Sequence, residues 1–307
     1  LTDNKRMHWE YDRESQCLTI SGDEVPDYYR RQPELISSTY YEYTRPLPPW
    51  YEFKDKIKSI VLADGVTSIG SQAFKEMPLL ESVAMPASLT SISPLVFARC
   101  PKLKGIELPE GITSIGHATF EDCTSLEQIY IPDGVEVIEN GIFAGCTSLT
   151  QLHLPDSIIS IENRAFYGCV NLKQLSIPNT VRKFTASAIT RSGISELSVR
   201  WLNPMSVARG DRKDTDPYSR IEALDTYNLK DEDINWVSNV NLIVPEGTIK
   251  NYQSAQYWSR FSTITEDGVP PIDKKRYMLE YYEGLEPFGD VADKFYDMPC
   301  MVLPTKE

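Results

Sequence analysis

The sequence predicts an α/β solenoid, a stack of short strands joined by helical or 3-10 turns. Four residue types recur at intervals of 23 residues, which is the main observation behind this prediction. They are phenylalanine (Phe74, Phe97, Phe120, Phe143, Phe166), leucine (Leu80, Leu103, Leu126, Leu149, Leu172), proline (Pro86, Pro109, Pro132, Pro155, Pro178) and cysteine (Cys100, Cys123, Cys146, Cys169). A unit of this length cannot bury its own apolar face, whereas stacked copies bury one continuous face.

Each repeat contains two short apolar segments. Alternation at residues 106–108 predicts a strand with one face inward. Pro109 ends this strand, because proline offers no N–H to a ladder. A turn and a second apolar pair, Ile112 and Ile115, follow. We expect a helical or 3-10 turn over residues 119–123 to return the chain to the next strand.

The repeats divide the chain into three parts. Residues 1–56 form an N-terminal cap with an aromatic, proline-rich loop. Residues 57–267 form the solenoid, with an irregular charged segment near 205–240. Residues 268–307 form a C-terminal tail, which is too aromatic for a solvated linker and is expected to pack on the solenoid.

Both ends of the stack need a cap, because a terminal repeat otherwise exposes its apolar face. Alternation around a polar turn predicts a β-hairpin over residues 9–20. An amphipathic helix over residues 252–261 is expected to close the other end. Between the two, the register slips once: Leu197 follows Leu175 at a spacing of 22 residues.

The cysteine column allows two interpretations, buried free thiols or disulfides between neighbouring repeats. Side chains in register point in parallel, which favours free thiols. Zinc is disfavoured, because no His or Cys pair has ligand spacing. We therefore expect no metal site and no cofactor. Cys17 and Cys300 lie outside the column, and the sequence does not decide whether they pair.

The charge excludes two classes of partner. There are 31 Lys and Arg residues against 44 Asp and Glu residues, a formal net charge of −13. Nucleic acid and anionic lipid surfaces need a basic footprint, so neither is expected. No apolar run reaches the ~18 residues of a membrane-spanning helix. The chain starts at Leu1, so we expect a processed or truncated chain from which an export or lipid-attachment segment was removed.

The repeat resembles that of the BspA-like leucine-rich repeat family, L-x-x-I-x-L-P-x-G-[IV]-x-x-I-x-x-x-[AT]-F-x-x-C, as residues 103–123 illustrate. The match runs from Ile57 to Val181 without a gap. The resemblance implies a leucine-rich repeat stack in a cell-surface or secreted protein of a host-associated bacterium, often exported as a lipoprotein. Characterised relatives are adhesins that bind matrix proteins or other cells. They share no catalytic residues, so none is carried over.

The candidate binding surface is the outward face of the strands. Six residues on it form a polar and aromatic patch: Glu107, Gln128, Tyr130, Gln151, His153 and Gln174. One interpretation is a contact surface for a protein or glycan, with Tyr130 as its anchor. The other is an ordinary solvated sheet face.

No enzyme is predicted. A catalytic His153 would need a nucleophile or carboxylate within hydrogen-bond reach. Glu107 lies two strands away, on the order of 10 Å by strand spacing. No G-x-S-x-G, H-E-x-x-H or phosphate-binding glycine loop is present.

Two functions remain. The first is an adhesin or protein-interaction scaffold that binds a host or bacterial surface protein, such as a matrix protein. The second is a carbohydrate-binding accessory protein with an aromatic platform at Trp50 and Tyr51, at Trp201 or at the tail tyrosines. Packing in the caps is the alternative role for Trp9, Trp50 and Trp258.

Overall fold

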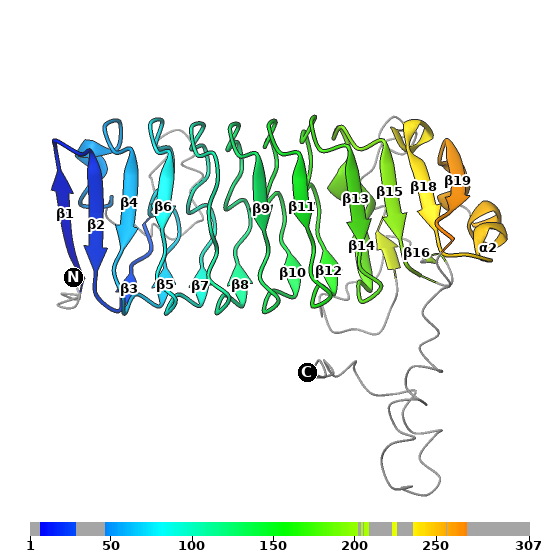
Figure 1. The fold of residues 1–307 in the computed structure, drawn as a ribbon, viewed down its shortest axis with the longest axis horizontal. Coiled ribbons are helices and arrows are strands. Elements are labelled where there is room, and N and C mark those ends of the chain that lie inside the picture. Colours follow the sequence, from blue (N-terminus) through cyan, green and yellow to red (C-terminus); the bar gives the residue numbers. More distant parts are fainter. Residues whose placement is uncertain are drawn as a thin grey trace, which may run out of the picture.

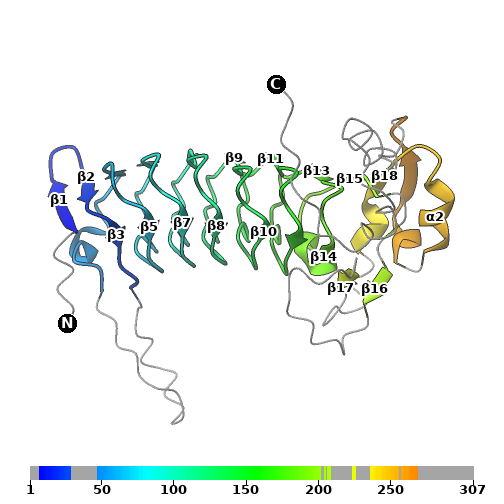
Figure 2. The ribbon, with the colours of Figure 1, turned by 90° about the horizontal axis from the view of Figure 1, so that it is seen from below.

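The computed structural model describes residues 7–28, 47–201, 204, 206–208, 223–225, 236–255 and 257–268, to which the statements below refer. Short strands lie side by side along the long axis, in an upper and a lower row (Figure 1). Turned by 90°, the same stack is seen from below (Figure 2). The predicted solenoid of stacked short strands is thus confirmed, but it is a β-solenoid with little helix and not an α/β solenoid.

The upper row, here called the first ladder, contains parallel strands that follow one another by about one repeat or, in three places, by about two. Its members are β2 (Cys17–Ser21), β4 (Ser59–Leu62), β6 (Ser82–Ala84), β9 (Gln128–Tyr130), β11 (Gln151–His153), β13 (Gln174–Ile177), β15 (Glu196–Val199), β18 (Asn241–Val244) and β19 (Thr263–Glu266). Leu175 pairs with Leu197, which confirms the predicted 22-residue slip. The strand expected at residues 106–108 does not form, and Gly105 makes only an isolated bridge to Gln128. Glycine weakens a strand because it has no side chain to pack.

The lower row, the second ladder, contains shorter strands. They are β3 (Glu24–Val25), β5 (Ser68–Ile69), β7 (Ser91–Ile92), β8 (Ser114–Ile115), β10 (Val137–Ile138), β12 (Ser160–Ile161), β14 (Lys183–Thr185), β16 (Ser206–Ala208) and β17 (Ala223–Asp225). They pair in parallel, as Ser91 with Ser114 shows. At the end of this row the strand order is β14-β17-β16, so β16 lies outside β17 although it precedes β17 in the chain.

The third side of each repeat consists of turns, so no α-helix forms over residues 119–123, although the Cys123 amide donates to the Phe120 carbonyl at 3.1 Å, a 3-10 type of bond. Left-handed residues interrupt this side, and these cannot continue a right-handed helix. They form two columns along the stack: Gln72, Leu95, Ala118, Gly141 and Arg164, and Glu76, Arg99, Asp122, Gly145, Gly168 and Arg191. In the regular repeats only η2 (Ala186–Ile189) is helical on this side.

The remaining helices are short. They are the 3-10 helices η1 (Tyr51–Phe53), η3 (Trp236–Asn239) and η4 (Trp258–Arg260), and the α-helix α2 (Ile249–Ser254). Within the described part of the chain, no helix has the length and apolar character that crossing a membrane requires.

The two ends of the first ladder differ. At one end, β1 (His8–Asp12) pairs antiparallel with β2, which in turn pairs in parallel with β4. At the other end, the single helix expected over residues 252–261 is wrong, because Ala255 is extended and separates α2 from η4. The capping roles of both segments stay predictions. Residues 269–307 and most of 205–240 lie outside the described residues, so the packing of the tail is untested.

A column of stacked aromatic rings runs through the core. Trp50, Phe74, Phe97, Phe120, Phe143 and Phe166 are all fully buried. The centroids of neighbouring rings are 5.6 to 6.1 Å apart, and the last four rings are nearly parallel. Each repeat therefore contacts the next through the same apolar group.

The four cysteines of the column are buried free thiols, which confirms the first interpretation. Each thiol donates a hydrogen bond to a backbone carbonyl 26 residues earlier, at 3.1 to 3.3 Å. Burial raises the pKa of the Cys100 and Cys169 thiols to about 12, and it raises the pKa values of Cys123 and Cys146 well above the ordinary value. Cys17 is a free, half-buried thiol, and Cys300 lies outside the described residues.

These thiols predict a loss of stability at high pH. A group whose folded pKa is raised stays protonated in the folded state, so its contribution is complete below the unfolded pKa and is lost as pH rises toward the folded pKa. For Cys100 this window runs from 9.0 to about 12. Each thiol then lowers the free energy of unfolding by at most about 1.4 kcal/mol per pH unit. Urea unfolding between pH 8 and 10 should show a shallower decline for Cys100→Ala than for the unchanged chain, and identical slopes would contradict the argument.

Candidate binding surface

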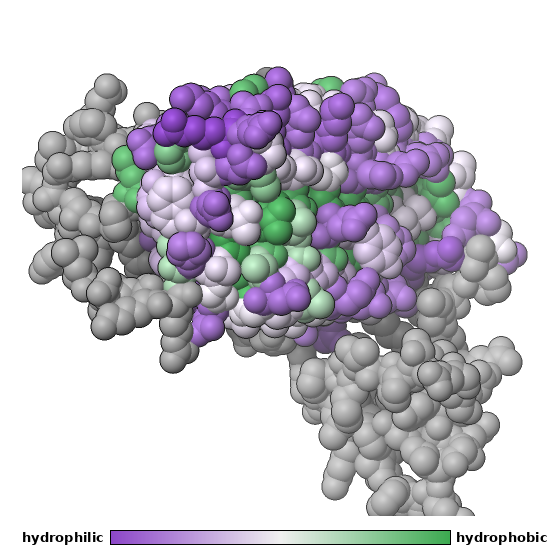
Figure 3. All heavy atoms as spheres, turned by 60° about the vertical axis from the view of Figure 1, so that its left-hand side comes forward, coloured by the Kyte–Doolittle hydropathy of each residue, from purple (hydrophilic) through white to green (hydrophobic). Residues whose placement is uncertain are grey.

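Two rows of side chains point outward from the first ladder. Their positions follow from the pleat, because every second residue of a strand faces away from the core. One row contains Thr19, Val61, Ala84, Glu107, Tyr130, His153 and Ser176, and the other contains Ser59, Ser82, Gly105, Gln128, Gln151 and Gln174. The view that brings the N-terminal end forward shows apolar side chains in a band between hydrophilic ones (Figure 3).

Tyr130 and His153 form the most prominent feature of these rows. Parallel pairing of β9 and β11 places the two residues opposite each other. Their rings stack with centroids 5.4 Å apart and planes 15° from parallel. The Tyr130 side chain is nevertheless 55% exposed, which is unusual for a large aromatic residue. One face of the sheet thus presents a paired aromatic surface to solvent.

The remaining candidates flank this stack. Gln128 lies opposite Gln151 on the same two strands, and both are exposed. We call Gln128, Tyr130, Gln151 and His153 the ladder-face patch. Gln174 is exposed on β13, where its amide donates to the Glu196 carboxylate at 3.2 Å. Glu107 is exposed in the repeat without a regular strand. The structure therefore brings four of the six candidates together, with the other two at the borders.

Beyond the exposed Glu107, the side chains on the N-terminal side of the patch are short. Thr19, Val61 and Ala84 occupy the Tyr130 row there, and Val61 is 38% exposed. Gly105, next to Gln128, has no atom within 4 Å of the place where a Cβ would lie. The Glu107 carboxylate thus lies between the patch and a low, uncharged surface that a flat partner segment could cover.

The tryptophans whose side chains the structure describes form no exposed platform. The Trp50 indole is fully buried and donates to the Ala73 carbonyl at 3.0 Å. Trp201 is also buried and donates to the Val181 carbonyl at 3.1 Å. The expected platforms at Trp50 and Trp201 are therefore wrong. Packing is confirmed for Trp50 and Trp258, and Trp9 is half-buried, with its ring centroid 6.4 Å from that of Trp50. The tail tyrosines lie outside the described residues.

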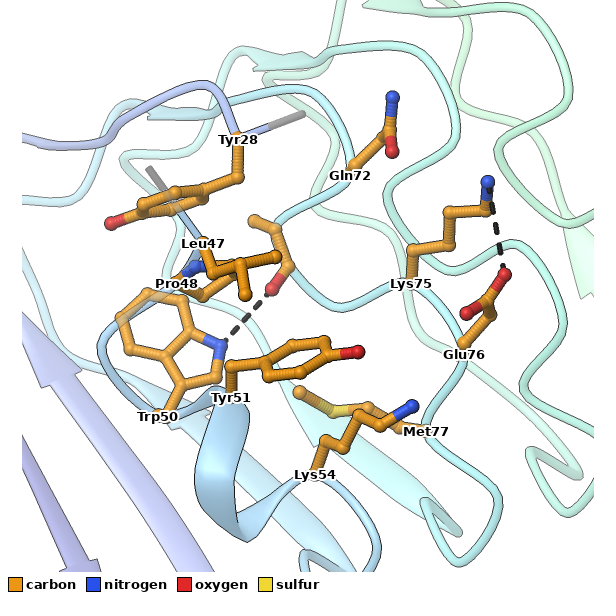
Figure 4. A pocket seen from close by; sticks show the side chains of 11 residues that line it. Tyr28, Leu47, Pro48, Trp50, Tyr51, Lys54, Gln72, Lys75, Glu76 and Met77 are labelled. Carbon is orange, nitrogen blue, oxygen red and sulfur yellow. Dashed lines mark hydrogen bonds and ion pairs between the residues drawn. The ribbon is translucent and has the colours of Figure 1, made fainter. Parts of the chain in front are cut away.

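A shallow pocket lies beside Trp50 (Figure 4). The half-buried Tyr51 ring lines it, and the Lys54 ammonium lies 5.0 Å from that ring's centroid. Lys75 and Glu76 form an ion pair of 3.9 Å at its border. Burial raises the pKa of Tyr28, another lining residue, to about 12. Within the described ranges, no group of three or more His, Cys, Asp or Glu residues could hold a metal ion.

The fold and the outward rows define a repeat solenoid with an exposed strand face. A model of the BspA type leucine rich repeat region matches residues 50–146 and 113–201, in six copies. The repeat region of this chain thus belongs to the BspA-type leucine-rich repeat family, which confirms the resemblance seen in the sequence. No curated protein matches the chain.

Solved structures of bacterial leucine-rich repeat proteins are similar to the chain. A leucine rich cell surface protein from Faecalibacterium prausnitzii A2-165 is 27% identical, with a TM-score of 0.46 over 65% of this chain and 54% of that one. This chain therefore spans about half of that protein's length. A leucine rich repeat protein of T. pallidum is 25% identical, with a TM-score of 0.43 over 64% of this chain and 84% of that one. One from Bacteroides ovatus is 17% identical, with a TM-score of 0.39 over 85% and 75%.

Proposed function

We propose that this chain is a non-catalytic binding scaffold of a bacterial cell surface that holds a protein partner on the ladder-face patch. The observation that supports this most is the exposed Tyr130–His153 stack. Tyrosine is enriched among residues that dominate binding energy, because it offers a large contact area and loses little conformational freedom.

The strands beneath the patch support the same proposal. The patch residues lie on β9 and β11, which are hydrogen-bonded to each other. The middle residues of these strands, buried Ile129 and half-buried Leu152, face inward and pack in the core. A partner that docks there would find the side chains already placed, which lowers the entropic cost of association.

The more specific roles depend on the family. BspA-like proteins are typical of bacterial surfaces, so we propose an extracellular or surface location, with lipid attachment through a removed N-terminal segment. An adhesin that binds a host matrix protein or another surface protein fits this location. The proposal contains no catalytic step and no cofactor.

The test is binding of the purified chain to an array of matrix proteins and an array of glycans. We expect saturable binding of one protein on the array. The affinity for that protein should fall about 30-fold or more in the Tyr130→Ala/Gln151→Ala variant, which is the loss typical of an interface anchor. The control variant is Val61→Ala/Ser82→Ala, which changes the same outward face outside the patch and should bind as before.

Two results would contradict this proposal. Equal loss in the control variant would mean that the patch has no special role. A glycan signal that survives the Tyr130→Ala/Gln151→Ala change would favour the carbohydrate-binding accessory protein, for which Tyr51 is the remaining described aromatic candidate.

A further inference from the structure

We propose that the turn side of the repeats carries a second binding site, which takes Asp or Glu side chains of a partner protein. The site consists of Arg164, Tyr167 and Arg191, here called the arginine–tyrosine cluster. The guanidinium carbons of Arg164 and Arg191 lie 4.4 and 5.7 Å from the centroid of the Tyr167 ring. Both arginines are exposed, and Tyr167 is half-buried. The cluster does not include any residue of the ladder-face patch.

The backbone holds the cluster in place. Arg164 and Arg191 both have left-handed backbones, with φ of 56° and 55°, and each belongs to one of the two left-handed columns of the turn side. The Tyr167 amide donates to the Arg164 carbonyl at 3.1 Å, and the Tyr167 carbonyl accepts from the Gly145 amide at 2.8 Å. These bonds tie the cluster to the neighbouring repeat. The three side chains therefore start from fixed positions, although two of them are long.

The charges of the cluster are not neutralised. Earlier on the turn side, Arg99 lies 3.2 Å from Glu76 and 3.9 Å from Asp122. By contrast, neither Arg164 nor Arg191 has an ion-pair partner among the described residues. Two unpaired guanidinium groups thus lie against one tyrosine ring. The face of the tyrosine ring attracts both cations and so offsets their mutual repulsion.

The chemistry of the cluster identifies its ligand. A guanidinium group presents N–H donors in a planar fork that matches a carboxylate with two parallel hydrogen bonds. The net charge of −13 repels polyanions at long range, which disfavours anionic polysaccharides and nucleic acids. The Tyr167 ring already stacks with arginines, so it is not a platform for a sugar ring. One or two carboxylates on a protein surface fit best.

The arginine side chains themselves can report on binding. We would record Nε–Hε NMR signals of the full, 15N-labelled chain during titration with the peptide acetyl-Gly-Glu-Gly-Glu-Gly-amide. The matched probe contains Gln in place of Glu. We expect saturable shifts of the Arg164 and Arg191 signals with the Glu peptide alone. Arg164→Gln/Arg191→Gln should weaken binding about tenfold, whereas Arg99→Gln, which removes a paired arginine, should not.

Three outcomes would overturn the assignment. The first is that the Arg164 and Arg191 signals do not shift with the Glu peptide. The second is equal shifts with the Gln peptide, because charge would then play no part. The third is tighter binding of a heparin hexasaccharide through the same two signals, which would make the cluster a site for anionic glycans. Unchanged circular dichroism of the double variant would exclude loss of the fold as the cause of weaker binding.

Discussion

Phe120→Ala is expected to lower the free energy of unfolding by about 3–5 kcal/mol. Phe120 is fully buried and stacks on Phe97 and Phe143, with centroids 5.8 and 5.7 Å away. Its removal takes away apolar contact area and leaves a cavity between two repeats. Each repeat contacts mainly its neighbours, so no distant part of the core can compensate. Urea unfolding followed by circular dichroism measures the loss.

Phe120→Leu is the matched variant, because leucine keeps most of the apolar volume and removes the ring. We expect a smaller loss than for alanine. Amide hydrogen exchange should speed up most in the repeats that contain Phe97 and Phe143, which contact residue 120. A loss below about 1 kcal/mol for Phe120→Ala would show that the ring column contributes little to stability.

Gly116→Ala is expected to have the second-largest effect, a loss of about 1–3 kcal/mol. A Cβ at Gly116 would lie 2.4 Å from the Pro94 nitrogen and 2.7 Å from the Ser93 carbonyl carbon. These are backbone atoms, so no side-chain rotation relieves the overlap and the two repeats must separate. Thermal unfolding of the variant and the unchanged chain is the measurement.

Gly105→Ala is its control, since the same methyl group is added where no atom lies within 4 Å. It should leave stability unchanged or raise it by about 0.4–1 kcal/mol, because alanine restricts the unfolded chain. The two substitutions should therefore have different signs. Equal losses would mean that backbone contact between the repeats does not limit the size of residue 116.

The 23-residue period was sufficient to predict both the stack and its register. The pairing of Gln128 with Gln151 follows from the period alone, whereas the change to 22 residues before β15 was read from the apolar pattern around Leu197. The left-handed residues that keep these turns from forming helices were not predicted, because the deciding signal is missing from the early repeats. There, Glu76 and Arg99 adopt the left-handed conformation that Gly145 adopts later. Since such residues favour right-handed backbones, local propensity points to the wrong conformation.

The binding surfaces were predictable to different degrees. Alternation along a strand identifies Tyr130 and His153 as outward residues, and the period makes them neighbours. Burial of Trp50 and Trp201 depends on contacts with residues about 20 positions away, at Ala73 and Val181, which composition does not reveal. The arginine–tyrosine cluster was missed, although the 23-residue period places Arg191 next to Gly168, the residue that follows Tyr167.

The regular repeat also fixes the distances between features along the stack. Neighbouring strands of a ladder are separated by about 4.8 Å, so equivalent residues on one ladder lie a whole number of such steps apart. Because the Phe and Cys contacts between the regular repeats are alike, gain or loss of a whole unit would change this distance while leaving the type of contact unchanged. Partners that bridge two features of the stack would thus select chain length in discrete steps.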